Sequence, residues 1–144
     1  MAKQTKRQTS PEPTGERLPD AELEVLACLW QRGSATAREV REMMEPYRPM
    51  THGAMVTLLK RLSAKGWVTR EKGPVGKAFV YTPTRKAAPT QRRILADLTH
   101  RVFGGSGVAV MANLLDATSP SIEEIDTLQT MLDDLRAKRH KRQT

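Results

Sequence analysis

The segment 51–83 constrains the fold more than any other part of the chain, because its pattern changes from helical to strand-like within a short distance. Its first half places apolar side chains three and four residues apart, which predicts an amphipathic helix from about Thr51 to Lys65, ended by Gly66. The apolar stripe consists of Met55, Leu58, Leu59 and Leu62. The second half has two short alternating runs around a turn with Gly73 and Gly76, which predicts a β-hairpin.

Two further helices are predicted before this segment. An apolar stripe over residues 18–30 is followed by Gly33, a residue typical of helix C-termini. A second helix begins at Thr36, because Thr36 and Glu39 have the spacing of a capping box, and Pro46 ends it. Three helices followed by a hairpin are the plan of a winged helix-turn-helix, whose third helix is the one that reads DNA in proteins of this type.

The charge of the chain is concentrated around the predicted third helix and hairpin. The whole chain of 144 residues has a formal net charge of +8 and a pI of about 10.1. Between Thr51 and Lys86 there are eight basic residues and one acid, Glu71, so this segment carries +7. A surplus of this size predicts a polyanionic partner, either nucleic acid or an acidic membrane surface.

The helix face opposite the apolar stripe supplies the candidate DNA contacts. Small residues let a backbone approach DNA closely, hydroxyl and amine groups suit phosphates or base edges, and Val56 suits a thymine methyl group. The predicted contacts of the helix are Thr51, His52, Gly53, Val56, Thr57, Lys60 and Arg61, and those of the hairpin, which suit the DNA backbone or the minor groove, are Arg70, Lys72 and Lys77. The alternative is a solvated basic face without a defined contact, and this applies most to Lys65 and Lys72.

The chain after Pro83 is predicted to be helical throughout. Helices are expected at 90–103, 106–117 and 119–139, the last with Ser119 as its N-cap and Pro120 in its first turn. Their apolar stripes are wide for short helices and need partners, which predicts a dimer. The predicted dimerisation residues are Ile94, Leu98, Val102, Val108, Met111, Leu115, Ile125, Leu128 and Leu132.

These patterns predict a mostly α fold with a small β-hairpin, in three parts. Residues 1–17 are a polar, disordered basic arm, residues 18–84 a winged helix that binds DNA, and residues 85–144 a helical dimerisation domain with a basic tail. The competing interpretation is a winged helix that binds an acidic protein without sequence-specific DNA binding.

Other classes of function find little support in the sequence. The single cysteine, Cys28, lies among apolar residues and is expected to be buried, and it excludes an internal disulfide and a cysteine metal cluster. His52, His100 and His140 lie on separate segments, so we expect no catalytic residues, no bound metal and no cofactor. The absence of a secretory signal and of a membrane span predicts a cytoplasmic protein without membrane insertion.

Three stretches together resemble the penicillinase-repressor family (the BlaI/MecI/CopY type). They are LPDAELEVLACLWQRGSATAREVREMM, MVTLLKRLSAKGWVTREKGPVGKAFVYTP and RVFGGSGVAVMANLLDATSPSIEEIDTLQTMLDDL. The resemblance runs from about Leu18 to Leu135. It implies a dimeric transcriptional repressor that binds a palindromic operator through its recognition helix and wing.

The resemblance also implies an inducing signal, which in the β-lactam systems is relayed by a membrane-bound sensor protease. The candidate cleavage site is the bond between Val102 and Phe103, although Val102 stands where the family has a polar residue. The cysteine cluster of the copper-responsive members is missing. The sequence THGAM at the start of the recognition helix replaces two hydroxyl residues of the family with Gly53 and Ala54, which implies a different operator.

Overall fold

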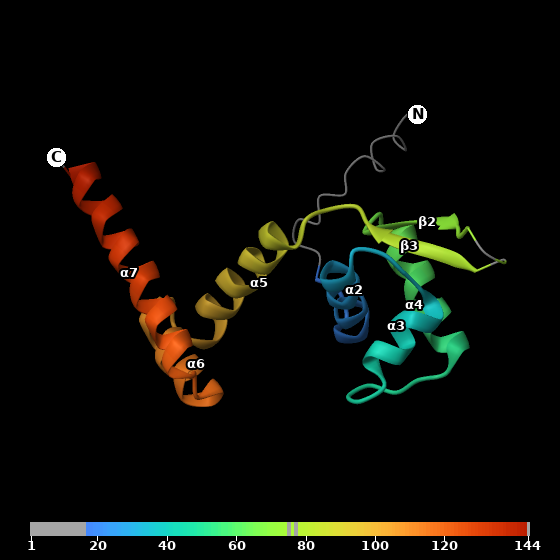
Figure 1. Cartoon of the computed structure of the whole chain (residues 1–144), viewed down its shortest axis with the longest axis horizontal. Coiled ribbons are helices and arrows are strands. Elements are labelled where there is room, and N and C mark those ends of the chain that lie inside the picture. Colours follow the sequence, from blue (N-terminus) through green and yellow to red (C-terminus); the bar gives the residue numbers. More distant parts are fainter. Residues whose placement is uncertain (1–16, 75, 77, 144) are drawn as a thin grey trace. The chain divides into compact units, whose positions relative to one another are not determined.

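The computed structural model describes residues 17–74, 76 and 78–143, so most of the predicted arm 1–17 lies outside the described residues. The chain divides into two compact units, Met1–Gln91 and Arg92–Thr144, which are unit 1 and unit 2 below. The described residues of unit 1 form three complete helices, the start of a fourth and a small sheet, and those of unit 2 are helical (Figure 1). The predicted fold class, a winged helix-turn-helix followed by a helical domain, is confirmed.

The first described elements of unit 1 are α2 (Asp20–Arg32), β1 (Ala35–Thr36) and α3 (Ala37–Met44). The predicted capping box is present: the Glu39 amide donates to Thr36 Oγ1 over 3.2 Å, and the Thr36 amide donates to Glu39 Oε1 over 2.9 Å. Gly33, with a φ of 99°, occupies the left-handed conformation that ends α2 and leads into β1. Both helix boundaries therefore follow from local sequence signals.

The recognition helix and the hairpin complete unit 1. They are α4 (His52–Ala64), β2 (Val68–Lys72) and β3 (Phe79–Pro83). The sheet is antiparallel with the order β1-β3-β2, and Ala35 pairs with Tyr81 while Val68 pairs with Pro83. The hairpin was predicted and β1 was not, because a two-residue strand shows no periodicity.

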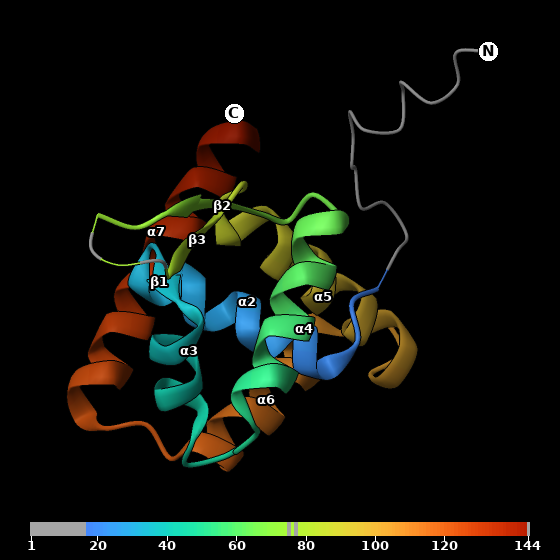
Figure 2. The ribbon, with the colours of Figure 1, turned by 90° about the vertical axis from the view of Figure 1, so that its right-hand side faces the viewer.

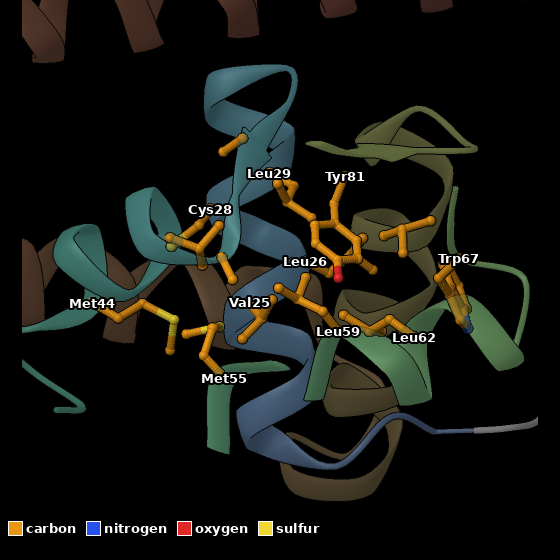
Figure 3. Close-up of a cluster of buried hydrophobic side chains, with 14 residues drawn as sticks. Val25, Leu26, Cys28, Leu29, Met44, Met55, Leu59, Leu62, Trp67 and Tyr81 are labelled. Carbon is orange, nitrogen blue, oxygen red and sulfur yellow. The ribbon is translucent and has the colours of Figure 1, made fainter. Parts of the chain in front are cut away.

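The core of unit 1 lies between the three helices and the sheet. Figures 1 and 2 show α2, α3 and α4 on one side of the sheet. The buried apolar side chains come from α2, α3, α4 and all three strands: Val25, Leu26, Leu29, Val40, Met44, Met55, Leu59 and Leu62 of the helices are joined by Ala35 of β1 and by Trp67, Val68 and Tyr81 of the β2–β3 region. Figure 3 shows this cluster, with Met44 at one end and Trp67 at the other. The predicted burial of Cys28 is confirmed.

The chain segment after β3 is attached to unit 1. The Thr84 amide donates to the Trp67 carbonyl over 2.9 Å, and the Trp30 indole N–H donates to the Arg85 carbonyl over 3.0 Å. The Arg85 guanidinium lies 4.9 Å from the centre of the Trp67 ring, a cation–π distance. These contacts hold residues 84–85 against the end of the recognition helix, next to the predicted domain boundary.

Unit 2 comprises most of α5 (Ala87–Val102), together with α6 (Gly107–Thr118) and α7 (Ile122–Gln143). Ser106 caps α6 by accepting from the Ala109 amide over 3.0 Å. The predicted cap of the last helix was wrong. Ser119 ends α6 with a φ of 47°, and Ser121 begins α7 in a capping box with Glu124.

Candidate nucleic-acid interface

Helix α4 separates a buried face from an exposed one. Met55, Leu59 and Leu62 have no exposed side-chain surface, while Leu58 is half-buried against the same core. The opposite face is open to solvent. The exposed residues of α4 are His52, Gly53, Ala54, Thr57, Lys60, Arg61 and Ala64. The predicted inward stripe is therefore confirmed, and five of the ten predicted contacts are exposed on this helix.

Two hydroxyl groups on this face already have partners within the chain. Thr51 Oγ1 accepts from the Ala54 amide over 3.1 Å and so caps the start of α4. Thr57 Oγ1 donates to the Gly53 carbonyl over 3.0 Å. In this conformation both oxygens keep acceptor capacity, while the Thr57 proton is committed to the helix backbone.

Gly53 has no structural reason to be glycine. A Cβ atom added at this position would meet no atom within 4 Å, and the residue is in the first turn of α4 without a positive φ. Glycine lowers helix stability relative to alanine by about 0.5–1 kcal/mol. The chain thus accepts a less stable helix at an exposed position where its own packing gains nothing.

Val56 differs from the other predicted contacts. It is half-buried and packs against the core of unit 1, so only part of its side chain is available on the surface.

Polar contacts fix both ends of α4. At its C-terminal end, Lys65 Nζ lies 2.7 Å from Oε1 of Glu22, a residue of α2 whose side chain is 2% exposed. The expectation that Lys65 is a loose surface charge was therefore wrong. Ahead of its N-terminal end, Arg48 forms a bidentate ion pair with Glu24, and Arg41 donates to the Met50 carbonyl over 3.4 Å.

The shifted pKa values belong to this scaffold. The hydrogen bond and charge of Arg48 hold the pKa of Glu24 below its usual range. The Thr36 amide does the same for Glu39 in the capping box. A hydrogen bond with the Cys28 thiol, together with desolvation, raises the pKa of Tyr47 to about 12. These groups stabilise the connections between helices and stay in one charge state near neutral pH.

The β2–β3 hairpin carries the remaining predicted contacts. Arg70 and Lys72 are exposed, and the Arg70 guanidinium lies 4.2 Å from the centre of the Phe79 ring on the neighbouring strand. The Gly73 amide donates to the Ala78 carbonyl over 2.8 Å where the strands meet the loop. Lys77 lies outside the described residues. Arg70 is exposed on β2, an edge strand of the sheet, and its planar guanidinium suits phosphate oxygens.

The predicted dimerisation residues are all accessible in the single chain. Leu128 is half-buried, and the side chains of Ile94, Leu98, Val102, Val108, Met111, Leu115, Ile125 and Leu132 are 38–81% exposed. Val102 ends α5, and Phe103 precedes Gly104 and Gly105, both with positive φ. The candidate cleavage bond thus lies at the C-terminal end of α5, between the exposed Val102 and the half-buried Phe103, whose amide donates to the Thr99 carbonyl over 3.1 Å.

The described residues hold neither a metal-binding cluster nor a membrane-spanning helix. Within residues 17–74, 76 and 78–143, no group of three or more His, Cys, Asp or Glu side chains is placed to hold a metal ion. No helix in those ranges combines the length and the apolar character needed to cross a bilayer.

Comparisons with known proteins agree with this geometry. The family model described as penicillinase repressor matches residues 18–134. The penicillinase repressor of Bacillus licheniformis is 28% identical over 118 residues, which cover 82% of this chain and 91% of that protein. The methicillin resistance regulatory protein MecI of Staphylococcus aureus (strain N315) is 24% identical over 115 residues, 80% of this chain and 92% of that protein.

Among solved structures, the YusO protein from Bacillus subtilis aligns with a TM-score of 0.50 and 22% identity, over 83% of this chain and 75% of that chain, and so shares the fold. The family match covers most of the chain, including the helix-turn-helix, the hairpin, α5, α6 and the first part of α7. The chain belongs to the penicillinase repressor family and is a DNA-binding transcriptional repressor.

Proposed function

We propose that this repressor acts in the cytoplasm as a homodimer that binds a palindromic operator. Each subunit inserts α4 into the major groove, where Gly53 and Thr57 face base edges and Lys60 and Arg61 contact phosphates. The hairpin contributes Arg70, Lys72 and Lys77 to the flanking backbone. A two-fold protein dimer matches a two-fold site, with half-sites about one helical turn or a multiple of it apart.

One observation carries the proposal: Gly53 stands in open space on the exposed face of the recognition helix. A winged helix that only presents charge to an acidic protein has no use for a destabilising glycine there. A glycine at this position is useful, however, in a helix whose backbone lies close to the base edges in a DNA groove. The +7 charge of segment 51–86 supports the same interpretation, because each phosphate that is neutralised releases counterions.

Selection of bound duplexes from a random pool tests the function directly. We expect enrichment of an inverted repeat whose half-sites differ from those of the β-lactamase operators. Salt-sensitive retention without any enriched sequence would contradict operator recognition. Retention of an acidic protein in place of DNA would favour the competing interpretation, a protein-binding winged helix.

Gly53→Ala is expected to raise the stability of the fold and to lower operator affinity. The added methyl group meets no atom of the chain, so the free energy of unfolding should rise by about 0.5–1 kcal/mol. The same methyl group occupies the space that DNA would enter, so operator affinity should fall by about tenfold or more, a loss of about 1.4 kcal/mol. Denaturant unfolding and a binding titration measure the two effects.

Gly107→Ala is the matched control. Gly107 is the first residue of α6, and a Cβ atom there would also meet no atom within 4 Å. This substitution should leave operator affinity unchanged. If Gly53→Ala binds the selected operator as tightly as the parent chain, DNA does not approach α4 at this position.

The proposal includes release of repression by a membrane-bound sensor protease that cuts between Val102 and Phe103. The exposure of Val102, 65%, and the glycine turn that follows support access by a protease. Cleavage there would divide α5 from α6 and so separate the DNA-binding unit from most of the proposed dimer interface.

A further inference from the structure

Helix α7 changes charge abruptly along its length. Residues 122–134 contain five acidic residues and no lysine or arginine, whereas residues 135–143 contain five lysine and arginine residues and no acid. The latter stretch, the C-terminal basic segment, is helical to Gln143, and its side chains are exposed. Its basic residues are Arg136, Lys138, Arg139, Lys141 and Arg142.

The apolar stripe of α7 gives way to arginine in this segment. At about 100° per residue, Leu128, Leu132, Leu135, Arg139 and Arg142 fall in one strip about 80° wide. Apolar residues occupy the strip up to Leu135, and arginines continue it. Burying an unpaired guanidinium is costly, so an apolar interface that covers the strip has to end near Leu135. The basic segment therefore extends beyond the proposed subunit interface.

Four of the five cations of the segment have no opposite charge beside them in the described part of the chain. Among residues 17–74, 76 and 78–143, Arg136, Lys138, Arg139 and Arg142 form no ion pair within 4.0 Å. Lys138 and Arg142 are four residues apart on the helix, a spacing at which like charges repel. The helix dipole favours cations in the last turn only, and Arg136 and Lys138 lie before it. A polyanion would relieve this repulsion.

We propose that the C-terminal basic segment is a second DNA-binding surface, which contacts the phosphate backbone without sequence preference and independently of α4 and the hairpin. Three of its five cations are arginines, whose planar guanidinium groups match phosphate oxygens. An anionic membrane is the less suitable partner, because Leu135 and Ala137 are the segment's apolar residues and it has no aromatic side chain. The inference rests on the proposed function only in taking duplex DNA as the polyanion.

The test uses the full chain and a short duplex that lacks the operator, titrated between about 50 and 200 mM salt. The variant R136Q/K138Q/R139Q/R142Q removes the four charges and keeps good helix formers at exposed positions. Its salt slope should be shallower by about two to four units, and its affinity at low salt should fall by about 10- to 100-fold. The charge-conserving variant R136K/R139K/R142K should keep the slope of the parent chain.

Operator binding keeps this test separate from the proposed function. The quadruple variant should retain the preference for operator over unrelated duplex, whereas Lys60→Ala should reduce operator affinity and leave the contribution of the basic segment intact. An unchanged salt slope in the quadruple variant overturns the proposal. The proposal is also overturned if the quadruple variant loses only its binding to vesicles that contain phosphatidylserine. Circular dichroism shows whether the helix content of each variant matches the parent chain.

Discussion

Leu132→Asp is expected to convert the proposed dimer into monomers and to lower operator affinity by at least about 100-fold, because a dimer gains from binding two linked half-sites. The Leu132 side chain is 60% exposed in the single chain, so its replacement should spare the local structure of α7. In a dimer interface, however, the aspartate would be buried without a partner. Sedimentation at micromolar concentration and an operator titration measure the two effects.

The reason for expecting a dimer is the contrast between the two units. Unit 1 buries its apolar side chains in one cluster, whereas unit 2 exposes apolar residues on all of its helices. Large exposed apolar side chains in this number are typical of a protein interface. The exposed residues include Leu95, Leu114, Ile122, Met131 and Leu135 in addition to the predicted dimerisation residues.

Thr130→Asp is the control for Leu132→Asp. Thr130 lies on the polar side of the same helix, where its hydroxyl donates to the Asp126 carbonyl over 3.2 Å. The Thr130→Asp substitution adds the same charge two residues from Leu132, and the protein should remain dimeric with nearly unchanged operator affinity. A Leu132→Asp variant that still sediments as a dimer would place the interface on another surface.

Sequence reasoning succeeded where the information is local. The capping box of Thr36 and Glu39, the glycine after each of α2 and α4, and the stripe of Met55, Leu59 and Leu62 all depend on residues a few positions apart. The same local signal was available for α7, since Ser121 and Glu124 have capping-box spacing. Pro120 favours Ser119 as the cap of this helix, but the left-handed conformation of Ser119 excludes it from that role.

Sequence reasoning failed where a contact joins distant segments. Strand β1 exists because Ala35 and Thr36 pair with Tyr81 and Val80, and two residues carry no strand pattern of their own. Likewise, nothing near Glu22 or Lys65 in the sequence indicates that the two side chains meet. The exposed face of α4 was predictable from one periodic stripe, whereas the contacts that orient the helix were not.

Glu22 and Lys65 are expected to be compatible with a stable unit 1 only when both are present, because either charge alone would be left without its partner. Lys65→Met leaves the carboxylate of Glu22, 2% exposed, without its partner, and should lower the free energy of unfolding by about 2–3 kcal/mol. This is below the cost for a fully buried pair, because 33% of the Lys65 side chain is exposed and solvent screens its charge. Denaturant unfolding of unit 1 measures the change.

The double variant Glu22→Leu, Lys65→Met decides whether that loss reflects the pair or the unpaired charge. Two apolar side chains of similar size can replace a buried pair at little cost, so its stability should lie within about 1 kcal/mol of the parent chain. Lys60→Met, an exposed lysine on the same helix, should change stability by less than about 0.5 kcal/mol. If Lys65→Met costs no more than Lys60→Met, the pair behaves as a surface ion pair. If the double variant keeps its stability but loses operator selectivity, then the pair serves to orient the recognition helix against α2.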